Sequence, residues 1–103
     1  MTILVLLISS CNNFVAEEKI AGTNWKINYN WIIGGSGSAD IYFFKDGSTD
    51  WGGTWTQEEE HVQWKYTTTK TVTYTGTISN KQMTGTMIND KGDSGTWTAT
   101  KYL

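Results

Sequence analysis

Residues 71–102 read TVTYTGTISNKQMTGTMINDKGDSGTWTATKY and hold the clearest pattern in the chain. They contain three short alternating segments, each with a Gly-Thr pair before an apolar residue: Gly76-Thr77-Ile78, Gly85-Thr86-Met87 and Gly95-Thr96-Trp97. The glycines recur every nine to ten residues, which is the spacing of strands in an antiparallel meander joined by tight turns. The same signature stands earlier at Gly53-Thr54-Trp55 and, with one insertion, at Gly22-Thr23-Asn24-Trp25. This repeat predicts an all-β domain.

The composition agrees with strands and excludes one class of partner. The 103 residues suffice for one domain. Seventeen threonines, six tryptophans and five tyrosines with no proline favour pleated, half-buried surfaces. The net charge is −2 and the eight basic residues are all lysines, scattered along the chain. Without arginine the chain lacks the fork donor that reads guanine and grips phosphate, so we expect no nucleic-acid partner.

The N-terminus carries a short apolar run, residues 3–8, followed by Ser9, Ser10 and the lone Cys11. Six apolar residues are too few to cross a bilayer, and an apolar run before small residues is typical of a secretory signal. The sequence Ile8-Ser9-Ser10-Cys11 resembles the bacterial lipobox, which implies that Cys11 is lipid-modified and becomes the mature N-terminus.

We therefore predict a signal-peptide-like segment at residues 1–10, an anchor and tether at 11–21, and a folded domain at 22–103. The protein would be a cell-envelope lipoprotein that contacts the membrane through its lipid anchor only. No basic residue precedes the apolar run, so the other interpretation is an N-terminal strand with a buried free cysteine. A single cysteine excludes an intramolecular disulfide.

Alternation along the chain predicts seven strands. In the first of them Trp25, Ile27, Tyr29 and Trp31 share one face. Residues 34–38, Gly-Gly-Ser-Gly-Ser, are expected to be a flexible loop. The expected strands are 23–31, 39–45, 49–57, 61–67, 71–79, 82–88 and 94–102.

Strand parity limits how such a meander closes. Neighbours in an up-and-down meander are antiparallel, so an odd number would bring the first and last strands together in parallel. Closure then requires an eighth strand, from residues 13–20 or from a split at Gly52-Gly53. We expect a small antiparallel up-and-down meander of seven or eight strands, forming a closed or nearly closed barrel, because closure removes exposed edges.

Three motifs carry a family resemblance: Asp46-Gly47, Gly53-Thr54-Trp55 and the closing Gly95-Thr96-Trp97-Thr98-Ala99. With these the domain resembles the small lipocalin-like domains of bacterial lipoproteins and is distantly similar to avidin-type barrels. The resemblance implies a barrel that holds a small apolar ligand. No biotin-binding set transfers residue by residue.

The polar residues give no sign of catalysis. His61 stands beside Glu58, Glu59 and Glu60 in an expected turn, faces outward by parity and has no nucleophile in its pattern. Residues 90–93 lack the carboxylate spacing of a calcium loop and are expected to form a solvated turn. We predict a non-enzymatic protein with no catalytic residue, no metal and no cofactor.

The aromatic residues are the candidate ligand site. One interpretation is that they only fill the core, and the other is that some line a pocket at the barrel mouth. Trp31 and Trp51 lie beside glycine-rich bends and are the best candidates for partly exposed rings. The first hypothesis is a site for a small hydrophobic or aromatic ligand; the alternative is a surface module that binds glycan or protein through exposed aromatics. The predicted site residues are Trp25, Tyr29, Trp31, Trp51, Trp55, Trp64, Tyr66, Tyr74 and Trp97.

Overall fold

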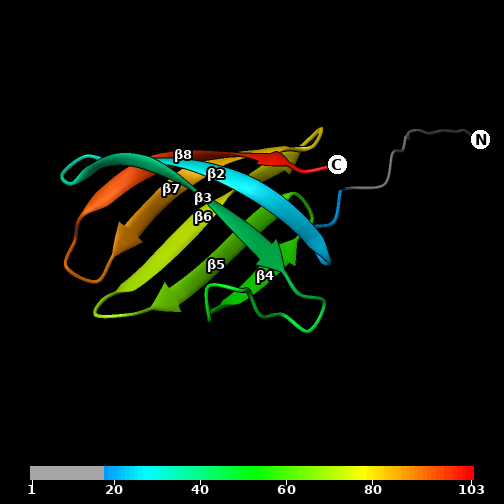
Figure 1. Cartoon of the computed structure of the whole chain (residues 1–103), viewed down its shortest axis with the longest axis horizontal. Coiled ribbons are helices and arrows are strands. Elements are labelled where there is room, and N and C mark those ends of the chain that lie inside the picture. The colour runs from blue at the N-terminus through cyan, green and yellow to red at the C-terminus, as the bar shows by residue number, and fades with distance from the viewer. Residues whose placement is uncertain (1–17) are drawn as a thin grey trace, which may run out of the picture.

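The structure, a computed structural model, describes residues 18–103 and shows one curled antiparallel sheet, a half-barrel (Figure 1). The seven strands lie in the order β3-β2-β8-β7-β6-β5-β4. The predicted all-β meander is therefore confirmed. The strands are β2 (Thr23–Trp31), β3 (Gly35–Phe43), β4 (Thr54–Glu58), β5 (His61–Thr67), β6 (Thr71–Ser79), β7 (Gln82–Asn89) and β8 (Ser94–Lys101).

The sheet is not closed, so the expectation of a closed barrel is not met. β3 and β4 are its two end strands, and only two isolated bridges join them through the connecting chain: Phe43 to Thr49 and Ser48 to Thr54. Because both bridges are antiparallel, Ser48 and Thr49 supply an extra reversal between β3 and β4. This reversal lets β8 pair antiparallel with β2 in a sheet of seven strands.

β3 begins at Gly35, so the prediction of a flexible loop at residues 34–38 was wrong. All nine of its residues pair with β2, from Thr23 opposite Phe43 to Trp31 opposite Gly35. Gly37 lies opposite Tyr29, and a Cβ atom on Gly37 would come within 2.6 Å of the Tyr29 hydroxyl oxygen. The tyrosine ring thus covers the glycine, which gives this weak strand former an aromatic neighbour.

The Gly-Thr repeat is a device for close approach between strands. Gly76 and Gly85 face one another across β6 and β7, and Gly85 also pairs with Trp97 of β8. A Cβ atom on Gly76 would lie 2.6 Å from Cζ2 of Trp97, so only glycine leaves space for the indole. The Trp97 Nε1–H donates to the Thr86 carbonyl oxygen at 2.8 Å, which fixes the ring over the glycine pair.

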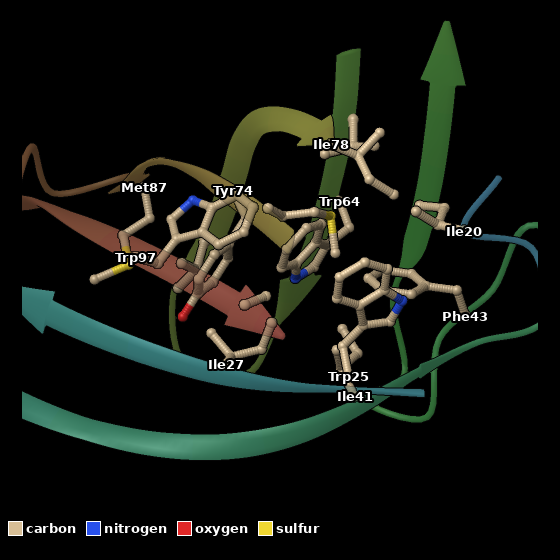
Figure 2. Close-up of a cluster of buried hydrophobic side chains, with 14 residues drawn as sticks. Ile20, Trp25, Ile27, Ile41, Phe43, Trp64, Tyr74, Ile78, Met87 and Trp97 are labelled. Carbon is tan, nitrogen blue, oxygen red and sulfur yellow. The ribbon is translucent and has the colours of Figure 1, made fainter. Parts of the chain in front are cut away.

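The core is built from aromatic and branched side chains on the inner faces (Figure 2). Trp25, Trp64 and Trp97 are its largest fully buried members. Ile20, within the segment predicted as a tether, is also fully buried at one end of the sheet. Its N–H donates to Gln57 Oε1 at 3.0 Å, and Gln57 Nε2 donates to the Glu18 carbonyl at 2.6 Å. Cys11 and the predicted signal segment lie outside the described residues.

Replacing Gly76 by alanine should destabilise the fold, because the new methyl group meets the Trp97 ring and the β7 backbone. We expect a loss of about 1–3 kcal/mol or more in the free energy of unfolding. Urea denaturation followed by tryptophan fluorescence measures it. The matched control is Thr77→Ala at the neighbouring exposed position, with a change below about 1 kcal/mol. Equal stabilities of the two variants would contradict the close-approach role.

Candidate functional site

The end of the half-barrel away from Ile20 holds a recess with a volume of about 340 Å³. We call it the aromatic recess. Thr68, which lines it, follows the end of β5, whereas Gln57, which holds Ile20, pairs with Val62 near the start of that strand. None of the lining side chains from residues 18–103 is charged. The lining residues are Tyr29, Trp31, Ala39, Trp51, Tyr66, Thr68 and Tyr74.

Alternation along three strands delivers most of these rings to the inner face. Tyr29 and Trp31 come from β2, Tyr66 from β5 and Tyr74 from β6. Tyr29, Tyr66 and Tyr74 each keep the parity of a buried residue two positions away, and Trp31 keeps the parity of Tyr29, so the strand pleat that forms the core also aims these rings at the recess. Tyr29, Trp31 and Tyr66 are only partly buried, whereas Tyr74 is buried.

Trp51 reaches the recess from the chain that connects β3 to β4. Its indole makes edge-to-face contacts with Tyr66 and Tyr74, with ring centroids 5.1 Å and 5.7 Å away. Its Nε1–H donates to the Asp40 carbonyl oxygen at 2.8 Å. The Gly52 backbone has a φ of 84°, a turn conformation that glycine adopts without strain, and it redirects the chain directly after Trp51. The hydrogen bond from Nε1 therefore fixes the Trp51 indole, and the turn at Gly52 fixes the main chain that carries it.

Tyr74, which lines the recess, belongs to the buried core and lies beside Trp64 and Trp97, as the close-up in Figure 2 shows. Tyr74 stacks on Trp64 with ring centroids 4.9 Å apart and an interplanar angle of 7°. Trp64 in turn meets the edge of Trp97 at 4.8 Å. The recess thus rests on a close-packed stack, which favours a preformed site over one that must collapse around its ligand.

The hydroxyls of Tyr66 and Tyr74 stay protonated into the alkaline range, because the pKa of each is raised. Burial raises the pKa of Tyr66, and the nearby Tyr29 raises it further. Burial also raises the pKa of Tyr74, and Tyr66 and Tyr29 add to that effect. At neutral pH these groups are uncharged hydroxyls that can donate or accept a hydrogen bond.

The structure brings five of the nine predicted aromatics to the recess: Tyr29, Trp31, Trp51, Tyr66 and Tyr74. The other four pack within or against the core. Ala39 and Thr68 also line the recess. No sequence pattern marks them, since small residues and turn residues carry no ligand signature. The four packing residues are Trp25, Trp55, Trp64 and Trp97.

The polar residues considered from sequence lie in turns or at the strand ends beside them. His61 is exposed beside Glu60, with Nε2 3.4 Å from Oε1. In the β7–β8 turn Asn89 Oδ1 accepts hydrogen bonds from the N–H groups of Lys91 and Asp93. Among residues 18–103 no three His, Cys, Asp or Glu side chains gather closely enough to hold a metal ion.

Comparisons of the chain with protein-family models, with curated proteins and with solved structures found no match. The lipocalin-like resemblance therefore stays a prediction from sequence. In the part of the chain that the structure describes, no helix is long and apolar enough to cross a membrane.

Alkaline titration should destabilise the domain. The folded pKa of Tyr74 lies above the unfolded value of about 10, so the stabilisation is complete below that pH and is lost as pH rises through the folded pKa. We expect urea midpoints to fall above about pH 10. Tyr74→Phe should show a smaller fall over the same range, with phenolate formation followed by absorbance near 295 nm. Identical pH profiles for the two proteins would count against a buried neutral phenol at this position.

Proposed function

We propose that this chain is a non-enzymatic binding domain that takes a small, neutral hydrophobic or aromatic ligand into the aromatic recess. The observation that carries the proposal is the convergence of five aromatic rings on an open hollow of about 340 Å³, to which the described part of the chain contributes no charged side chain. Concave, mostly apolar sites with a few polar groups are the usual form of small-molecule sites.

The lining selects for ligand chemistry. Trp51 and Trp31 offer ring faces and edges to a planar group, and aromatic pairs in such geometry gain free energy beyond simple burial. Tyr29 and Tyr66, which line the recess, supply hydroxyl groups as polar partners. A charged ligand would lose its hydration here without a counter-charge, so we expect neutral ligands to be preferred.

The filled interior limits ligand size. Trp25, Trp64 and Trp97 occupy the centre of the half-barrel and are at most 2% exposed. The recess volume lies near the lower end of the range of roughly 300–1,000 Å³ found for ligand pockets. A cavity of roughly 150 Å³ holds one benzene molecule. The ligand, or the part of it that binds, is therefore about one to two rings in size and lies at the mouth of the half-barrel.

A surface interaction module is the second candidate, and one observation favours it. The outer face of β6, β7 and β8 carries an uncharged groove of about 580 Å³. Threonines lie in register across it, with Thr77 opposite Thr84 and Thr84 opposite Thr98. Such a row of hydroxyls could hydrogen-bond a neutral glycan, but it offers no aromatic platform.

The lipid anchor is part of the same proposal. The sequence Ile8-Ser9-Ser10-Cys11 supports attachment of a lipid to Cys11 and a place in the cell envelope. Such an anchor would keep the binding domain at the membrane surface without a spanning segment.

Binding of small aromatic probes with one or two rings tests the recess. In titrations followed by tryptophan fluorescence and calorimetry, we expect indole and p-cresol to bind and their charged analogue indole-3-acetate to bind more weakly. Trp31→Ala should weaken indole binding at least about tenfold, because the variant removes one wall of the recess.

The control is Phe44→Ala, which removes a ring that is 43% exposed and lies outside the recess. It should leave indole affinity unchanged. Absence of probe binding, or equal binding by the Trp31→Ala variant and the parent protein, would refute the proposed function.

Metabolic labelling with a radioactive fatty acid in a bacterial host tests the anchor. The parent chain should incorporate the label and sediment with membranes, because a thioether-linked lipid holds it there. Cys11→Ala should incorporate none and appear in the non-membrane fraction. Equal labelling of both chains would rule out Cys11 as the attachment point.

A further inference from the structure

β3 has a free edge that the rest of the described chain covers only in part. At one end the Tyr42 carbonyl accepts from the Asp50 N–H at 3.2 Å, and the Tyr42 N–H donates to Asp50 Oδ1 at 2.9 Å. Alternation places the main-chain groups of Ser36, Ser38 and Asp40 on that same edge. Among residues 18–103 only the Asp40 carbonyl has a partner there, the Trp51 Nε1–H. The edge is therefore open from Ser36 to the Asp40 N–H.

This open edge lacks the features that normally protect a sheet end. Natural edge strands are blunted by lysine, proline or a bulge. Residues 35–39 read Gly-Ser-Gly-Ser-Ala, and β3 pairs with β2 residue for residue without a bulge. Gly35 to Ser38 are all exposed. Another extended segment can therefore approach the backbone without meeting a large side chain.

The aromatic recess opens beside the same edge. Ala39 lines the recess, and the Tyr29 hydroxyl lies over the backbone at Gly37. A strand added to β3 would place every second side chain on the inner face, next to the recess. One such side chain would fall between Tyr29 and Trp51.

A comparable pair of contacts already occurs within the folded chain, two residues further along the β3 edge at Tyr42. Asp50 pairs with Tyr42 through main-chain and side-chain hydrogen bonds. The next residue, Trp51, turns its indole over the inner face against Tyr66 and Tyr74. A main-chain contact at the β3 edge and an aromatic anchor on the inner face thus occur together in the folded chain.

We infer that the recess takes an uncharged apolar or aromatic side chain of an extended peptide, whose backbone pairs with β3 at Ser36, Ser38 and Asp40. The inference rests on the proposed function, since it names the ligand of the same recess. Main-chain hydrogen bonds at the edge supply affinity, and the recess supplies selectivity for the anchor side chain. The residues flanking the anchor direct their own N–H and C=O groups at β3, so both should be free to pair.

The experiment compares three probes on the full-length chain by calorimetry. They are p-cresol, the capped pentapeptide acetyl-Thr-Val-Tyr-Val-Thr-amide, and the same peptide N-methylated at both valines. We expect the peptide to bind at least about tenfold tighter than p-cresol, because it adds edge hydrogen bonds to the same ring. N-methylation should return its affinity to the p-cresol level, since the methyl groups remove the donors that face β3.

A pair of variants at one position supplies the control on the protein side. Ser38→Pro removes one edge donor and keeps the ladder to β2, since proline is tolerated where the N–H faces outward. It should weaken the peptide but not p-cresol. Ser38→Ala changes only the exposed side chain and should leave both affinities unchanged.

The outcomes separate the two proposals. If p-cresol binds but the parent peptide is no tighter, or its N-methylated form is equally tight, the edge inference is overturned and the proposed function stands. If neither probe binds, both fall. A dimer in sedimentation velocity that the peptide does not dissociate would assign the β3 edge to a second copy of the chain and also overturn the inference.

Discussion

The packing of Trp97 over the glycine pair of β6 and β7 is the constraint from which the rest of the half-barrel follows. Gly76 and Gly85 let the strands and the indole approach to distances that no Cβ atom allows. Trp97 is then fixed by its hydrogen bond to Thr86 and meets Trp64 at its edge. Trp64 carries Tyr74 on its face, and Tyr74 is the floor of the recess. The site is therefore an extension of the core rather than an independent loop feature.

The stacked aromatic core leaves one buried polar group, the Trp64 Nε1–H, without a hydrogen-bond partner among the described residues. An unpaired buried donor costs roughly 1–3 kcal/mol. Four ring contacts surround this side chain, with Phe43, Trp51, Tyr74 and Trp97. The dispersion and burial gained from these rings offset the unpaired donor, and the flat stack provides a rigid support for the recess.

Sequence alone predicted the strands whose pattern is enforced by burial. Residues 23–31, 61–67 and 71–79 match β2, β5 and β6 because one face of each is mostly apolar. The strand predicted at residues 39–45 overlaps the second half of β3, but the prediction missed the first half, residues 35–38, whose Gly-Ser composition favours a loop. There the strand is held from outside, by nine-residue pairing with β2 and by the Tyr29 ring over Gly37. Tertiary contacts of this kind override local propensity and leave no periodic signal.

The candidate site was likewise predictable only in part from the sequence. Parity placed Tyr29, Tyr66 and Tyr74 on the inner face, but parity cannot say how deep along the half-barrel each ring lies. That depth decides which tryptophans fill the core and which line the recess. It is set by the stagger of the strands and by the chain between β3 and β4, neither of which the residue pattern specifies.

The open edge and the recess have one structural cause. A meander with an even number of strands would place a complete strand between β3 and β4. That strand would cover the free edge of β3 and occupy the space of the aromatic recess. Here only Ser48 and Thr49 form the extra reversal of chain direction between β3 and β4. The Trp51 side chain that follows them packs on the inner face against Tyr66. One short connection therefore leaves the β3 backbone free and supplies a wall of the recess beside it. Because both features depend on the same few residues, lengthening this connection into a complete strand would remove the free edge and the recess together.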